Sequence, residues 1–246
     1  MFTSLPFAFW RGESGATGFG YRYGYDFDGI DEKINFGNVL DVATDQARTI
    51  SFWFKTSGTI QHIFANFTEI GNRDGYSVLT VSNKVRFLLA SSSTATIYTE
   101  TTNTYTNDEW NHISITYTGS ELASGVEMYL NGVQETVIVL DDDLTSYTTT
   151  GNNLTLGSNS GNDTYNFTGR LDDVQYYDFV LNATQVSDIY NNGYVTPPTA
   201  SPIHHWKLGE DDTVSTNWTV KDSVGSLDGT SVNLSLIHIS EPTRPY

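Results

Sequence analysis

The sequence predicts an all-β protein built as a sandwich or barrel of antiparallel strands. Short segments of alternating apolar and polar residues repeat along the chain, and turn residues separate them at intervals of about ten residues. Thr, Ser, Asn, Gly and Tyr are abundant, which is typical of strands joined by many turns. The chain has 246 residues, of which 13% are aromatic, so it can form one large domain or two small ones around a sizeable core.

Before residue 101, several segments alternate apolar and polar residues and predict strands. In TISFWFK, which spans residues 49–55, the side chains of Ile50, Phe52 and Phe54 share the face expected to enter the core. Further strands are expected at residues 60–67, 74–81, 84–90 and 94–100.

The central stretch of the chain predicts a hairpin. In WNHISITY, residues 110–117, the even-numbered residues lie on one face of a strand and the odd-numbered residues on the other. In the next strand Val126, Met128 and Leu130 share a face. The dipeptide Asn131-Gly132 follows, and both residues tolerate the positive φ that a type I′ turn requires. The chain then returns through VQETVIVL.

A last strand and a short helix are predicted near residue 193. The strand lies within FTGRLDDVQYY, and the helix is expected over ATQVSDIYNN, residues 183–192. Asn182 is a suitable N-cap, and Gly193 suits a left-handed stop.

Several of these strings together resemble the laminin-G-like domain of the concanavalin A-like lectin/glucanase superfamily. They are FDGIDEKINFG, TISFWFK, WNHIS, VEMYLNGV and GRLDDVQYYD. The resemblance covers roughly residues 22–193 and implies a jelly-roll β-sandwich of two antiparallel sheets. It does not imply one activity, because lectins, glycosidases and adhesion modules share this architecture.

The flanking segments predict a larger, truncated protein. Residues 1–21 form a Gly-punctuated lead-in, and residues 194–202 read as a Pro-rich linker. Residues 203–233 resemble the lead-in of another such domain, cut short. Residues 234–246, LSLIHISEPTRPY, look like a translated adapter from a sequencing library, so we expect a fragment of a metagenomic assembly from a phage or microbe and poor packing of this tail.

The charge balance excludes some partners. The formal net charge is −17, and such a surface repels nucleic acids and anionic membranes. No run of about 20 apolar residues predicts a membrane span. The N-terminus lacks a secretory signal, and the absence of cysteine favours a microbial or viral source or a reducing compartment. Taken with the resemblance, this favours an extracellular surface or a virion as the location.

Four aspartates are candidate calcium ligands. The first and last strands of a jelly roll are neighbours, which would bring Asp28 and Asp31 near Asp172 and Asp173. Carboxylate oxygens suit Ca²⁺, the candidate cofactor. In the alternative interpretation Asp28 caps its own turn and Asp172 or Asp173 faces solvent. The run Asp141–Asp143 is a second candidate site, or a solvated loop.

Tyrosines near Thr-, Asn- and Gly-rich loops are candidates for stacking on sugar rings. These residues are Tyr98, Tyr105, Tyr147 and Tyr165. The alternative is that tyrosines pack half-buried on the faces of the sheets.

The function favoured by the sequence is a non-catalytic carbohydrate- or glycoprotein-binding adhesion module of a larger surface or virion protein. The expected partners are a glycan or glycoprotein and other domains of the same chain or virion subunits. A purely structural spacer is the alternative. A glycoside hydrolase is disfavoured, because the superfamily's paired-carboxylate motif, E-x-D-x-x-E or E-x-D-x-E, does not occur.

Overall fold

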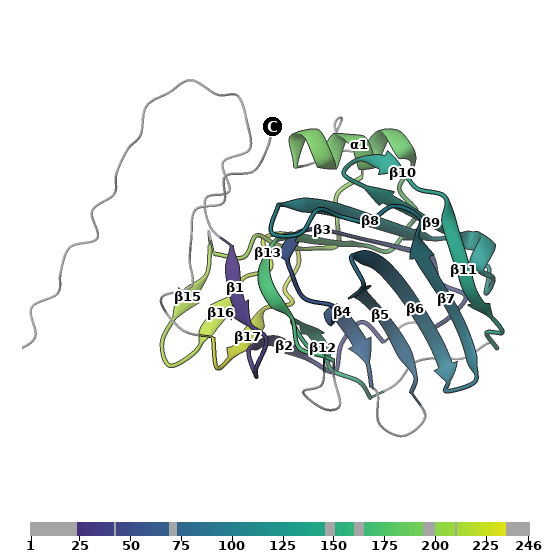
Figure 1. Ribbon diagram of the computed structural model, residues 1–246. Coiled ribbons are helices and arrows are strands. Elements are labelled where there is room, and N and C mark those ends of the chain that lie inside the picture. The colour runs from purple at the N-terminus through teal and green to yellow at the C-terminus, as the bar shows by residue number, and fades with distance from the viewer. Residues whose placement is uncertain are drawn as a thin grey trace, which may run out of the picture.

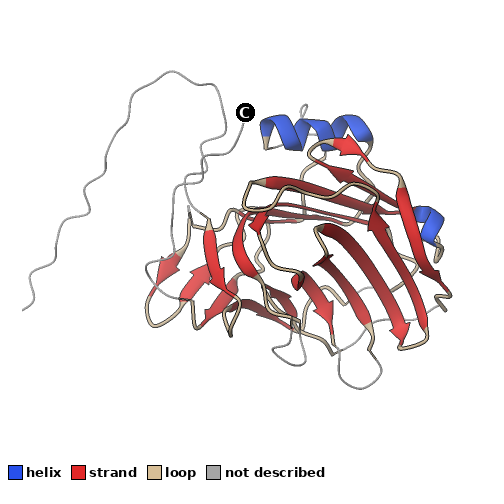
Figure 2. Cartoon of the chain, viewed as in Figure 1, coloured by secondary structure: helices blue, strands red, loops and turns tan. Residues whose placement is uncertain are grey.

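The computed structural model describes residues 24–41, 43–68, 73–145, 151–159, 165–193, 200–209 and 211–234. Two antiparallel sheets face each other and enclose the main core, and a helix lies on the outer side of one of them (Figure 1). Strands dominate the described residues, as Figure 2 shows. The predicted all-β jelly-roll sandwich is therefore confirmed.

The seven-stranded sheet has the order β1-β13-β3-β8-β9-β10, with β14 also paired to β13. Its strands are β1 (Tyr25–Asp28), β3 (Arg48–Thr56), β8 (Asn111–Tyr117), β9 (Val126–Leu130), β10 (Val133–Gln134), β13 (Thr168–Tyr177) and β14 (His204–Trp206).

The ten-stranded sheet has the order β11-β7-β6-β5-β4-β12-β2-β17-β16-β15. Its strands are β2 (Lys33–Gly37), β4 (Ile60–Phe67), β5 (Gly75–Val81), β6 (Lys84–Ser92), β7 (Ala95–Thr101), β11 (Val137–Asp142), β12 (Leu154–Leu156), β15 (Thr213–Val214), β16 (Trp218–Val220) and β17 (Gly229–Val232).

Side-chain alternation places the predicted faces in the core. Ile50, Phe52 and Phe54 of β3 belong to the main core cluster. The odd-numbered residues of β8 from Ile113 to Tyr117 join them, whereas His112 and Ser114 lie on the other face, where both contact the Ser51 hydroxyl. The inner faces of the two sheets therefore follow the period-two pattern of the sequence.

The central hairpin closes as predicted. Asn131 has φ 52° and Gly132 has φ 76°, as a type I′ turn requires. A short 3₁₀ helix, η1 (Ala123–Gly125), precedes β9. The returning segment VQETVIVL differs from the prediction, because it forms two strands, of which β10 pairs in the seven-stranded sheet and β11 in the ten-stranded sheet.

Helix α1 (Ala183–Asn192) begins and ends as its capping residues dictate. The Asn182 side chain accepts a hydrogen bond from the Gln185 backbone N–H. The Gln185 side chain in turn accepts one from the Asn182 backbone N–H, which completes a capping box. Gly193, at φ 68°, ends the helix. The Tyr190 ring stacks on Trp53 of β3 with 5.4 Å between ring centroids, so α1 covers the outer face of the seven-stranded sheet.

Residues 200–209 and 211–234, here called the closing segment, extend both sheets of the sandwich, where the sequence predicts a linker and the start of a second unit. Strand β14 pairs with β13 in one sheet, and β17 pairs with β2 in the other. The Trp206 side chain is fully buried in the main core, 4.6 Å from the Phe36 ring between centroids. Burial of this large apolar surface explains why the segment joins the sandwich.

Parts of the predicted organisation lie outside the described residues. These are the lead-in, most of the linker and residues 235–246, so the expected poor packing of the tail stays a prediction. Leu234, the first residue of that tail, is buried against the main core.

Candidate functional site

The outer face of the ten-stranded sheet carries a depression with a cavity volume of about 230 Å³. It crosses five neighbouring strands, β4, β5, β6, β7 and β11. Its lining residues are Phe67, Arg73, Leu79, Leu88, Ala90, Ser92, Ser93, Thr96, Tyr98 and Asp141.

The floor of the depression is apolar. Ala65, Phe67, Leu79, Leu88 and Ala90 form a cluster of their own, separate from the main core on the opposite face of the sheet. Strands with one solvated face place polar residues there, so these apolar side chains are an exception to the usual pattern. These five side chains are 0–7% exposed, so they form a small packed cluster beneath the depression and present little apolar surface to solvent.

The register aligns the floor with a polar wall. Leu88 of β6 lies opposite Tyr98 of β7, and Tyr98 lies opposite Asp141 of β11. A β-bulge between Val139 and Asp141 inserts Leu140, which shifts Asp141 onto the face of Tyr98. The Thr96 hydroxyl donates to the Asp141 carboxylate and fixes its position.

The Tyr98 ring is held from its own face of the sheet. Arg86 Nη1 donates to the Tyr98 hydroxyl at 3.0 Å, and the guanidinium carbon lies 5.2 Å from the ring centroid. Glu100 in turn accepts from Arg86 Nε at 2.8 Å and from Lys84 Nζ at 3.0 Å. Because the Tyr98 oxygen accepts from Arg86, its own proton is available for donation to a ligand.

Glu100 and Arg86 of this network stay charged at neutral pH. Partial burial opposes the charge of Glu100, but hydrogen bonds from Lys84 and Arg86 outweigh it and lower the pKa of that carboxyl. Burial also opposes the charge of Arg86, and the contacts with Tyr98 and Glu100 outweigh it and raise the pKa of the guanidinium. The ion pairs therefore persist across the neutral range and keep Tyr98 in place.

The arrangement suits a ligand with an apolar face and a polar edge. The Tyr98 ring can contact the C–H face of such a ligand, while hydroxyl, carboxylate and guanidinium groups at the rim exchange hydrogen bonds with its edge. Among the described lining residues Asp141 is the one carboxylate. The pair of carboxylates that glycoside hydrolysis requires is not assembled there.

The four predicted tyrosines have different positions. Tyr98 lines the depression. Tyr165 does not line it; its side chain is 51% exposed and lies beside His62 of β4. Tyr105 is 3% exposed and packs edge-on against Phe54 in the main core, so its ring is not accessible to a ligand. Tyr105 therefore packs against other side chains, as the alternative interpretation expects for tyrosines, but inside the main core rather than half-buried on the face of a sheet. Tyr147 lies outside the described residues.

The predicted calcium ligands do not converge. Strand β1 pairs with β13 as expected, but Asp28 lies opposite Thr168, four residues before Asp172. At about 3.4 Å per residue, that offset is about 14 Å along the strand. Asp28 Oδ1 instead accepts from the Ile30 backbone at 2.7 Å, so it caps its own turn, and Asp31 accepts from Asn233 at 2.9 Å.

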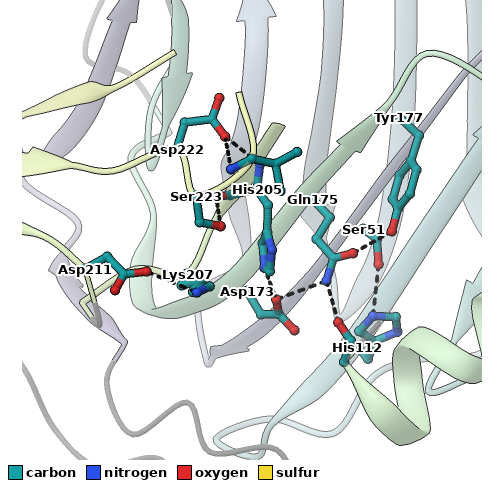
Figure 3. A network of polar contacts seen from close by, with 12 residues as sticks. Ser51, His112, Asp173, Gln175, Tyr177, His205, Lys207, Asp211, Asp222 and Ser223 are labelled. Carbon is teal, nitrogen blue, oxygen red and sulfur yellow. Dashed lines mark hydrogen bonds and ion pairs between the residues drawn. The ribbon is translucent and has the colours of Figure 1, made fainter. Parts of the chain in front are cut away.

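The other two predicted ligands, Asp172 and Asp173, are buried and do not face solvent. Asp173 Oδ1 lies 2.7 Å from His205 Nε2 of the closing segment and 3.0 Å from Gln175 Nε2 (Figure 3). Tyr177 donates to Gln175 at 2.6 Å and extends the network. Within the part of the chain that the structure describes, no three acidic, histidine or cysteine side chains gather as metal ligands.

Sequence reasoning missed the apolar floor and the residues that hold Tyr98. A signal was present: four consecutive apolar residues, Phe87 to Ala90, interrupt the alternation of β6. Such a run indicates that both faces of the strand are apolar. The Arg86–Glu100 pair depends on register between neighbouring strands and carries no short-range signal.

The chain belongs to the concanavalin A-like lectin/glucanases superfamily. Residues 28–187 match the Laminin_G_3 family of that superfamily. No curated protein sequence matches the chain. Across the described residues, no helix has the length and apolar character needed to cross a membrane.

Solved structures with the same architecture include carbohydrate-binding domains. The first is a protein from Bacteroides ovatus to which carbohydrate binding has been ascribed, with 14% identity and a TM-score of 0.62 over 91% of this chain. The chain spans 60% of the length of that protein.

Two further structures contain bound sugars. The CBM40 domain of the Ruminococcus gnavus IT-sialidase, in complex with α2,3-sialyllactose, has 15% identity and a TM-score of 0.52 over 68% of this chain and 96% of the domain. Domain 4 of AbnA, an extracellular GH43 arabinanase from Geobacillus stearothermophilus in complex with arabinotriose, has 19% identity and a TM-score of 0.51 over 68% of this chain and 76% of that domain. At these identities the similarity shows the fold alone.

Proposed function

We propose that the chain is a non-catalytic carbohydrate-binding adhesion module of a larger extracellular surface or virion protein. The observation that carries this proposal is the depression on the outer face of the ten-stranded sheet, where the Tyr98 ring lies beside the hydroxyl and charged groups of the rim. Sugar rings present the complementary surface, since their C–H faces are apolar and their edges carry hydroxyls.

The pre-positioned Tyr98 supports this proposal. Its ring is held by Arg86 before a ligand arrives, so binding does not have to order a free side chain. Asp141 is fixed beside it by Thr96 and offers an acceptor for sugar hydroxyls. The carbohydrate-binding domains among the similar structures add weight, because the same sandwich holds sugars in them.

A glycan array tests this function. The full chain and its Tyr98→Ala variant are applied to an array of neutral and acidic glycans. We expect the wild-type protein to bind a restricted set of glycans and Tyr98→Ala to lose that binding while keeping its unfolding midpoint within a few degrees. Failure of the wild-type protein to bind any glycan would favour the structural spacer instead.

A further inference from the structure

We propose that the seven-stranded sheet carries a second ligand site, which binds a small molecule with both a carboxylate and an ammonium group, of the class of free amino acids. The site is a cavity of about 220 Å³ beside β1, β13 and β3, the strands at one edge of that sheet (Figure 1). At about 30 Å³ per water, this volume holds roughly seven waters or one small molecule. Four charged residues line it, namely Asp26, Lys55, Asp108 and Arg170.

The strand register places these charges in a row. Asp26 of β1 lies opposite Arg170 of β13, and Arg170 lies opposite Lys55 of β3. Side-chain alternation in β3 directs Lys55 and its cross-strand partners away from the main core. Asp108 follows on the β8 side of β3, where its N–H donates to the Thr56 carbonyl at 3.1 Å. The order of charges along the cavity is therefore negative, positive, positive, negative.

The Lys55 ammonium has no partner, which is unusual in so acidic a chain. The sequence holds 29 acidic and 12 basic residues, and Lys84, Lys207 and Lys221 each form an ion pair with a carboxylate. The Lys55 ammonium forms no hydrogen bond or ion pair with any described residue, although two carboxylates line the same cavity. It lies directly opposite Arg170, and like charges in that position repel each other. A bound carboxylate between these two cations would remove the repulsion.

Arg170 has donors left for the same carboxylate. Its Nε donates to Asp26 at 3.3 Å, and within the described chain its two terminal nitrogens make no hydrogen bond. A guanidinium holds a carboxylate through two parallel N–H groups, and a neighbouring ammonium adds a point charge. The side chains of Arg170 and Asp26 are 31% and 36% exposed, so the surrounding chain partly shields these charges from solvent and from screening by salt.

Asp108 supplies the opposite charge for the ligand. Its carboxylate has no hydrogen-bond or ion-pair partner among the described residues, and its φ of 56° is a left-handed conformation that Asp tolerates. The four charges of the cavity cancel, and the net charge of −17 on the whole chain repels free anions. A ligand that is neutral overall meets both conditions, with its carboxylate at Lys55 and Arg170 and its ammonium at Asp108.

An NMR titration of the ¹⁵N-labelled full chain with the standard amino acids tests the inference. We expect a subset of them to shift the backbone amide signals of Thr168 and Gly169, which line the cavity. Two derivatives of the strongest binder serve as matched probes, its amide, which lacks the carboxylate, and its N-acetyl form, which lacks the ammonium. Each derivative should bind about three- to tenfold more weakly than the parent amino acid.

Two substitutions assign the charges of the ligand to residues of the cavity. Lys55→Met removes the ammonium and keeps the length of the side chain, and Asp108→Asn removes the charge with a residue that tolerates the left-handed backbone. We expect each variant to bind the amino acid about three- to tenfold more weakly. Lys55→Met should also lose preference for the amino acid over its amide, and Asp108→Asn should lose preference over the N-acetyl form.

Lys207→Met is the control, because it removes a lysine that lies outside the cavity. It should bind as the wild type. Absence of any shift at Thr168 and Gly169 with millimolar amino acids overturns the inference. Binding that Lys55→Met and Asp108→Asn leave unchanged overturns it as well, as does equal affinity for the amino acid and both derivatives. The lining residues of this cavity and of the depression around Tyr98 are different, so none of these outcomes bears on carbohydrate binding.

Discussion

His205 Nε2 lies 2.7 Å from Asp173 Oδ1, and both side chains are buried (Figure 3). The histidine belongs to β14 of the closing segment and the aspartate to β13 of the sandwich. We expect His205→Ala to lower the free energy of unfolding by about 2–4 kcal/mol, because a buried carboxylate loses a donor while its bond from Gln175 remains. Chemical denaturation measures this loss.

Lys207→Ala is the matched control for His205→Ala. Lys207 lies two residues further along the chain, and its ion pair with Asp211 is on the surface, with the Asp211 side chain 54% exposed. We expect a change below about 0.5 kcal/mol for this variant. Equal effects of the two substitutions would show that the buried contact does not contribute specifically.

Trp206 is expected to anchor the closing segment. Trp206→Ala removes a fully buried ring from the main core, together with its contact with the Phe36 ring. The expected cost is about 3–5 kcal/mol. The thermal unfolding midpoint of the full chain measures it, and an unchanged midpoint would contradict the placement of the segment in the sandwich.

Asp222 should make stability depend on pH in the acid range. Burial alone would raise the pKa of Asp222, but hydrogen bonds from His204 and from the backbones of His205, Gly225 and Leu227 outweigh it and lower that pKa. A lowered folded-state pKa stabilises the protein above the unfolded value, about 3.9, and this stabilisation is lost as pH falls through the folded value.

Urea unfolding from about pH 6 to about pH 2 tests the role of Asp222. We expect Asp222→Asn to be less stable than the wild type at the upper end and to lose less stability on acidification. A variant with the same acid dependence as the wild type would assign that dependence to other carboxyls.

Calcium binding through Asp28 and Asp172 stays a prediction that the register makes unfavourable. If added calcium raises the unfolding midpoint relative to EDTA, we expect Asp28→Ala to show the same rise, because Asp28 caps its own turn. Asp28→Ala itself should cost about 1 kcal/mol through loss of the turn contact. Disappearance of a calcium-dependent rise in Asp28→Ala would restore the predicted site.

Local chemistry made much of the fold predictable. Asn182 and Gly193 encode both ends of α1 in a few residues, and Asn131-Gly132 encodes the central turn. The alternation in β3 predicts which side chains enter the core. Each of these signals acts between residues close in sequence.

The remainder depends on contacts between distant residues. Residues 204–206 pair with β13, and β17 pairs with β2 almost 200 residues earlier in the chain. The β11 bulge that turns Asp141 toward Tyr98 is visible only in the register. Tyr105 also follows a Thr- and Asn-rich stretch, but its ring is buried and packs edge-on against the Phe54 ring in the main core. Composition near a residue does not reveal such neighbours.

Calorimetric titration of the strongest array glycan into three proteins tests the central claim most directly. The proteins are the wild type, Tyr98→Ala, and Ile30→Ala, a control whose side chain is 70% exposed at the turn after β1, outside the depression. We predict that Tyr98→Ala weakens binding about tenfold or more, since it removes both the stacking ring and a hydroxyl donor, and that Ile30→Ala binds as the wild type. Equal affinity of all three proteins would contradict the assignment of the carbohydrate site to this face of the sheet.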